Sequence, residues 1–120
     1  MTKSKQASNA QKMLREYRST IWRKSALEAV PGVGKNELSA CVEQMNFTKE
    51  LTTRLRSNKL LGEKLYWVIY ASYLTERQPG DVGEILAVIA QNFEHIPRRT
   101  YFRLKKRAIK MMDEQLKEIA

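Results

Sequence analysis

Seven cationic side chains and no acidic one lie between residues 98 and 110. Four of them are arginines, and an arginine can donate two hydrogen bonds to the O6 and N7 atoms of a guanine. Lysines and further arginines can bind backbone phosphates, which fix the register of a protein on a duplex. If these residues are helical, the arginine-rich amino end predicts a helix that enters the major groove of DNA.

The spacing of apolar residues in the same segment predicts such a helix. Pro97 is suited to its start, because the first amide of a helix has no partner within the helix. Beyond it, one face carries apolar residues every three or four positions, namely Tyr101, Leu104, Ala108, Met111 or Met112, and Leu116. We expect this face to be buried and the cations to lie mostly on the other faces. The alternative is a basic surface helix with no partner.

The charge of the whole chain is segregated. The formal net charge of the 120 residues is +9. Residues 1–24 contribute +6 from seven cations and one acid, residues 25–97 contribute −2, and residues 98–120 contribute +5 from eight cations and three acids. Two basic ends around a slightly acidic middle favour a polyanionic partner. A membrane surface is not expected, because the last helix lacks the broad Trp/Leu face of interfacial helices.

The rest of the chain predicts further helices and no strand. The first helix is expected at 10–30, a break at Pro31–Gly34, and a second helix from Asn36, as its cap, to about residue 55. A turn at 56–59 and a helix at 60–77 follow. Asp81 and Glu84 form a capping box that opens a helix at 82–92, and residues 94–96 form a turn. We expect an all-α helical bundle, with residues 1–34 as a basic arm and amphipathic helix and residues 35–120 as the main domain.

The segment from Asp81 to Met112 resembles the helix-turn-helix in the fourth region of bacterial sigma factors. Ile89-Ala90 and Phe93 are similar to its first helix, and Ile96 to the apolar residue of its turn. The recognition helix is matched by the following residues: Thr100, Tyr101, Leu104, Lys106-Arg107-Ala108 and Met112. There are two departures, since the turn is one residue longer than usual and Pro97 stands where a serine cap is usual. The resemblance places the helix-turn-helix at about 81–116.

Within that group the chain is most similar to the ArpU/RinA-type regulators, in its small size, its tyrosine-rich helix and its run from Tyr101 to Ala108. The resemblance implies a phage or prophage transcription regulator of late, packaging or lysis genes. It implies base contacts from Arg98, Arg99 and Arg103 and phosphate contacts from Lys105, Arg107 and Lys110, with Phe102 on a thymine methyl, a partner or the core. The DNA-binding residues expected in all are Arg98, Arg99, Phe102, Arg103, Lys105, Lys106, Arg107 and Lys110.

Other partners and assemblies remain open at this point. A small terminase subunit of a phage also carries a helix-turn-helix and binds DNA. A sigma-like domain can also dock on RNA polymerase. The apolar stripe of the first helix, which includes Leu14 and Tyr17, has to pack either on its own chain or on a second subunit, so a homodimer is a further alternative.

The remaining motifs favour neither catalysis nor metal binding. Residues 27–35 resemble a helix-hairpin-helix turn, which binds a DNA phosphate through backbone amides. Leu38 departs from that pattern, because it stands near a position that is usually occupied by a small residue. The alternative is a flexible linker. Cys41 and the tryptophans and tyrosines at helical spacing are expected in the core or an interface, and His95 in a turn. We expect no enzyme, metal or cofactor. No apolar run approaches ~18 residues and no signal sequence is expected, so a bacterial cytoplasm is the predicted location.

Overall fold

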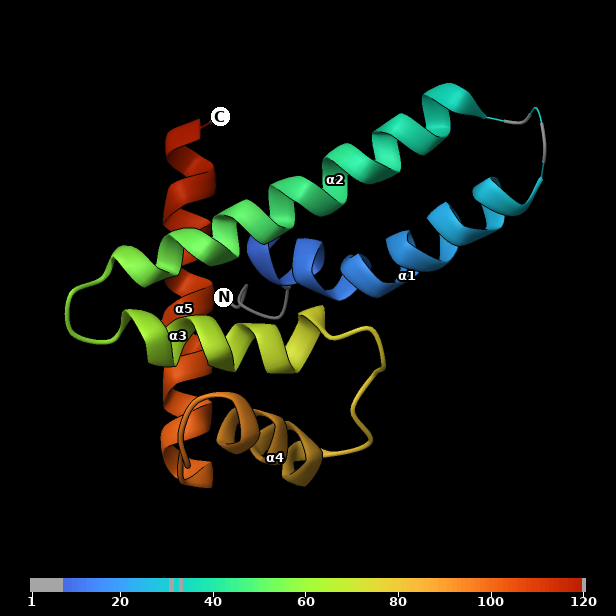
Figure 1. Ribbon diagram of the computed structural model, residues 1–120. Helices are drawn as coiled ribbons and strands as arrows, with labels where there is room; N and C mark the ends of the chain where they lie inside the picture. Colours follow the sequence, from blue (N-terminus) through green and yellow to red (C-terminus); the bar gives the residue numbers. More distant parts are fainter. Residues whose placement is uncertain (1–7, 31, 33, 120) are drawn as a thin grey trace, which may run out of the picture.

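The computed structural model describes residues 8–30, 32 and 34–119, and this part of the chain is helical without a strand (Figure 1). Lys3 and Lys5 of the predicted basic arm, and Pro31 and Val33 of the predicted break, lie outside the described residues. The helices, in chain order, are α1 (Asn9–Ala29), α2 (Lys35–Arg54), the 3₁₀ turn η1 (Leu55–Ser57), α3 (Gly62–Ile69), the π-helical segment η2 (Tyr70–Leu74), α4 (Val82–Asn92) and α5 (Arg98–Ile119).

Helices α1 and α2 form an antiparallel hairpin (Figure 1), and the two helices start in different ways. The Ser8 hydroxyl accepts a hydrogen bond from the Gln11 amide, which caps the start of α1. Helix α2 begins at Lys35, one residue earlier than the cap predicted at Asn36. The residue before it, Gly34, has φ +67°, a left-handed conformation that glycine adopts without steric cost. The chain therefore turns on a glycine and does not use the asparagine side chain.

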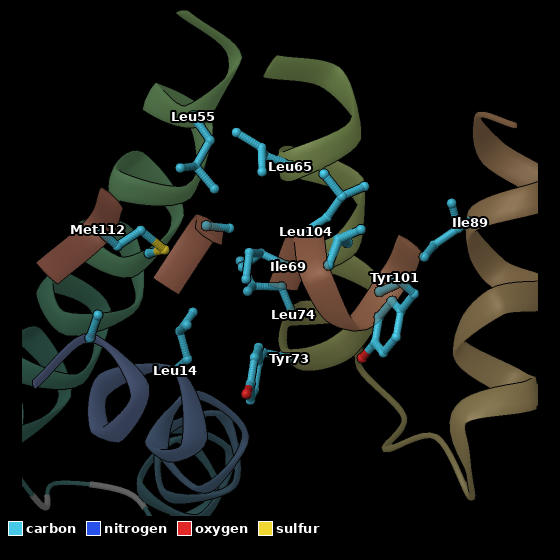
Figure 2. Close-up of a cluster of buried hydrophobic side chains, with 14 of the residues drawn as sticks. Leu14, Leu55, Leu65, Ile69, Tyr73, Leu74, Ile89, Tyr101, Leu104 and Met112 are labelled. Carbon is cyan, nitrogen blue, oxygen red and sulfur yellow. The ribbon is translucent and has the colours of Figure 1, made fainter. Parts of the chain in front are cut away.

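The core lies where α5 crosses α2 and α3, and α1 covers its other side (Figure 1). Figure 2 shows side chains from all these helices converging there, among them Leu14, Leu65 and Met112. Leu14 and Tyr17, from the predicted stripe of α1, are buried within this same chain. Trp22, which was expected in the core or an interface, lies outside the core and is 76% exposed in this chain.

The helix predicted at 60–77 is shorter and changes its winding. It begins at Gly62, where a Cβ atom would lie only 2.5 Å from the carbonyl oxygen of Arg56, so a larger residue does not fit there. From Tyr70 to Leu74 the winding is that of a π-helix, and the chain leaves it at Thr75 in an extended conformation. Arg18 of α1 donates hydrogen bonds to the carbonyl oxygens of Thr75 (3.0 Å) and Ser72 (3.4 Å). These bonds occupy carbonyl groups at the end of the segment, which explains why no regular helix continues.

Helix α4 follows with the bounds that the sequence predicts, whereas α5 begins after Pro97 and continues to Ile119, beyond the predicted end at Leu116. The Asp81 carboxylate accepts the Glu84 amide at 2.9 Å, and the Glu84 carboxylate accepts the Gly80 amide, so the capping box is present in a slightly shifted form. The connection to α5 covers residues 93–97, one residue more on each side than the turn predicted at 94–96. Ile96 of this connection is buried, as its apolar character predicts.

Candidate nucleic-acid interface

Helix α5 has one buried face and one cationic face. Tyr101, Leu104, Ala108 and Met112 are buried, which confirms the predicted stripe and selects Met112 over Met111 at its fourth position. With 3.6 residues per turn, the face opposite this stripe is made of residues spaced four, three and four apart. These residues are Arg99, Arg103, Lys106 and Lys110, and all four are exposed.

The other predicted residues flank this cationic face. Arg98 and Arg107 are exposed, Phe102 is 45% exposed, and Lys105 is half-buried. The structure therefore brings all eight predicted residues onto one helix, with seven of them open to solvent. Their full set is Arg98, Arg99, Phe102, Arg103, Lys105, Lys106, Arg107 and Lys110, called the α5 face below.

The cations of the α5 face are not neutralised by carboxylates. Within residues 8–30, 32 and 34–119, four ion pairs lie within 4.0 Å, and each of them uses a cation outside this face. One example is the pair of Lys24 and Glu28 on α1. Another joins Arg56 of η1 to Glu63 of α3. The acids of α5 itself, beginning with Asp113, follow the last cation of the face. A high positive potential over the first half of α5 results.

This arrangement of charge opposes the stability of the helix. Arg98 and Arg99 lie in the first turn of α5, which contains no acidic residue, and the amino end of a helix carries a partial positive charge. A cation there costs about 0.3–1 kcal/mol, the amount that an anion would contribute. Like charges four residues apart, such as Arg99 with Arg103 and Lys106 with Lys110, cost roughly 0.2–0.5 kcal/mol each. Stability of the free protein therefore does not account for these residues.

Aromatic rings orient the cations at the edge of the α5 face. The Arg98 guanidinium lies 5.8 Å from the centre of the Phe102 ring, and the Lys105 ammonium lies 5.3 Å from the Tyr73 ring. Such cation–π contacts contribute about 0.5–1 kcal/mol at exposed sites. Lys105 is therefore directed toward η2, at the flank of the face, and is less free than the lysines at 106 and 110.

The start of α1 lies directly beside the α5 face, which the sequence alone did not indicate. The Asp113 carboxylate of α5 accepts the Ala10 amide at 2.8 Å, so an acid from one helix caps another helix 103 residues away in sequence. A surface hollow at this junction is lined by Ser8 and Gln11 of α1 and by residues of α5, including Lys105 and Lys110. Arg15 and Arg18 follow Gln11 on the same side of α1, at a spacing that could have indicated a second cationic stripe.

Other kinds of site find little support in the described part of the chain. No group of three or more His, Cys, Asp or Glu side chains there is placed to hold a metal ion. The Cys41 thiol is buried, as predicted, and His95 is exposed in the connection before α5. Of the helices between residues 9 and 119, none combines the length and the apolar character needed to cross a membrane.

The α5 face thus offers arginines and lysines on a rigid, well-packed helix, with an exposed phenylalanine beside them. Guanidinium groups so placed can bind guanine edges or phosphates, and ammonium groups can bind phosphates. A search for related proteins gives this chain no relative, since no protein-family model, no curated protein and no solved structure matches it.

Proposed function

We propose that this chain is a sequence-specific DNA-binding transcription regulator in which α5 is the recognition helix. The observation that carries the proposal is the set of seven cations between Arg98 and Lys110, which are unpaired among the described residues and lie partly at the positive end of their helix. Duplex DNA presents one phosphate charge for about every 1.7 Å of its axis and suits such a surface.

In this proposal α3, α4 and α5 form a helix-turn-helix domain similar to the fourth region of sigma factors. Helix α4 crosses the DNA backbone, and the residues 93–97 connect it to α5, which enters the major groove. Arg98, Arg99 and Arg103 read base edges, and Lys106, Arg107 and Lys110 bind phosphates. The resemblance of its residues to the ArpU/RinA-type regulators supports a role in the control of late, packaging or lysis genes of a phage.

Selection of bound sites from a pool of random duplexes tests this function. A regulator of this kind enriches one sequence motif, and a variant carrying Arg99→Ala and Arg103→Ala fails to enrich it. The matched control carries Lys12→Ala and Arg23→Ala, which remove two exposed cations from α1 and leave α5 unchanged. If the unmodified protein binds duplexes from the pool but enriches no sequence motif, sequence-specific binding is contradicted.

A further inference from the structure

A second group of cations continues from the α5 face along α1. Arg15 and Arg18 lie on the same side of α1 as Gln11, one and two turns further along the helix, and Trp22 follows one turn later. Arg15 and Arg18 line two adjoining surface hollows, and Arg77 and Trp22 line the outer one. We call Arg15, Arg18, Trp22 and Arg77 the α1 band.

The α1 band is connected to the α5 face through Tyr73. The Lys105 ammonium of α5 lies 5.3 Å from the centre of the Tyr73 ring. The same tyrosine lines the inner hollow together with Arg15 and Arg18. On the other side, Gln11 of α1 lines the hollow that contains Lys105 and Lys110. The hollow that contains Lys105 and Lys110 and the hollows lined by Arg15 and Arg18 are thus linked through Gln11 and Tyr73.

The arginines of the α1 band are charged and form no ion pair among the described residues. Arg18 donates to oxygens of Thr75, at 3.0 Å and 2.8 Å, which are neutral groups. Burial lowers the pKa of Arg18 from its ordinary value, but an arginine stays protonated at neutral pH. None of the three arginines belongs to an ion pair within the part of the chain that the structure describes.

Three carboxylates line the three hollows between α5 and the middle of α1, and two of them accept a hydrogen bond from a backbone amide. Asp113 accepts the Ala10 amide, and Asp81, which lines the inner hollow, accepts the Glu84 amide. Glu76 is the remaining acid and lines the outer hollow beside Arg77. Six cations and three acids line the three hollows, so this path as a whole is positive.

We propose that the α1 band binds the phosphate backbone of DNA that flanks the segment read by α5. From Gln11 to Trp22 the helix rises about 17 Å, which matches roughly five base pairs at 3.4 Å each. Trp22, 76% exposed at the far end, packs its ring against the sugar-phosphate backbone. The inference rests on the proposed function, because only continuity with a DNA-bound α5 selects DNA over an acidic protein as the partner.

The test compares two duplexes and two variants. One duplex contains only the selected site, and the other extends it on both sides by about ten base pairs, one helical turn. The band variant carries Arg15→Ala and Arg77→Ala, and the control variant carries Lys12→Ala and Arg23→Ala, which are exposed and line neither hollow. Thermal melting of each variant shows first that it is folded.

For the unmodified protein we expect tighter binding to the extended duplex, with a steeper fall of log affinity against log salt. The band variant should lose this gain, and its salt slope on the extended duplex should be shallower by about 1.8, or 0.9 for each lost phosphate contact. The control variant should keep the gain. If the band variant and the unmodified protein bind both duplexes alike, the inference is wrong while the proposed function stands. If the unmodified protein binds neither duplex, the proposed function itself fails.

Discussion

The hydroxyl groups of Ser72 and Tyr101 lie 2.7 Å apart in the core, and they join the π-helical segment to the first turns of α5. The Ser72 hydroxyl also lies 2.6 Å from the Val68 carbonyl oxygen, which can only accept. Because a serine has one hydroxyl proton, Ser72 donates to Val68 and Tyr101 donates to Ser72. This bond adds to the buried stripe of Tyr101, Leu104, Ala108 and Met112, which together set the rotation of α5 about its axis.

Removal of the Tyr101 hydroxyl should weaken the fold and leave the α5 face in place. We expect Tyr101→Phe to lower the free energy of unfolding by about 0.5–1.5 kcal/mol, because Ser72 loses its donor. Ser72→Ala should have a similar effect. In a double-mutant cycle by urea unfolding, the two changes should not be additive. Additive losses would show that the two hydroxyls do not interact.

The two faces of α5 should respond differently to truncation. Leu104→Ala should lower the free energy of unfolding by ~2–5 kcal/mol, because Leu104 is buried in the cluster that contains Ile69 and Ile89. Lys106→Ala, on the exposed side, should change it by less than about 0.5 kcal/mol and weaken DNA binding. Thermal unfolding and DNA titration of both variants check this. The opposite order of stability effects would mean that α5 is rotated from its observed orientation.

Alkaline pH should destabilise the fold through Tyr17. Burial, and secondarily the nearby Tyr70, raise the pKa of Tyr17 above its ordinary value of 10.0. A raised pKa in the folded state means that the resulting stability is complete below about pH 10 and is lost as the pH rises through the higher value. We expect Tyr17→Phe to show a smaller loss of unfolding free energy than the unmodified protein between about pH 9 and pH 11. Equal losses in both proteins would exclude this contribution.

The amino end of α5 should determine sequence preference. Arg98→Ala and Arg99→Ala together should leave the melting temperature nearly unchanged or slightly raised, since both residues are exposed in a first turn that disfavours cations. If either arginine binds a guanine, its loss should cost ~1–3 kcal/mol on the selected site and relax the choice of base there. Competition with single-base variants of the site measures this. If the variant prefers the same bases as the unmodified protein, residues other than Arg98 and Arg99 recognise the bases.

Elements with a strong local signal could be predicted from the sequence. The Asp81–Glu84 box and the following apolar residues give α4 its bounds, and Tyr101, Leu104 and Ala108 give the buried face of α5. In both cases the residues that give the signal lie within a few positions of one another in sequence, so their spacing alone predicts the element. The all-helical fold follows from the same patterns.

Elements that depend on distant residues could not be predicted in this way. The π-helical segment ends where Arg18, 57 residues from Thr75 in sequence, occupies its carbonyl groups. The proximity of α1 to the α5 face depends on the bond from Ala10 to Asp113. The cationic stripe of α1 was therefore visible only as net charge. Of the two places expected for Trp22, the core and an interface, the structure excludes the core. The prediction that Asn36 caps α2 was wrong, because Gly34 already permits the turn before the helix.

The salt dependence of DNA binding tests the central claim most directly. If the α5 face and its surroundings contact about four to six phosphates, log affinity should fall against log salt with a slope of about −4 to −5. Alanine at both Lys106 and Lys110, which are proposed to bind phosphates, should make that slope shallower by about 1.8. Alanine at both Lys12 and Arg23 should leave it unchanged. A slope near zero for the unmodified protein on every duplex tested would contradict the assignment of α5 as a DNA-binding helix.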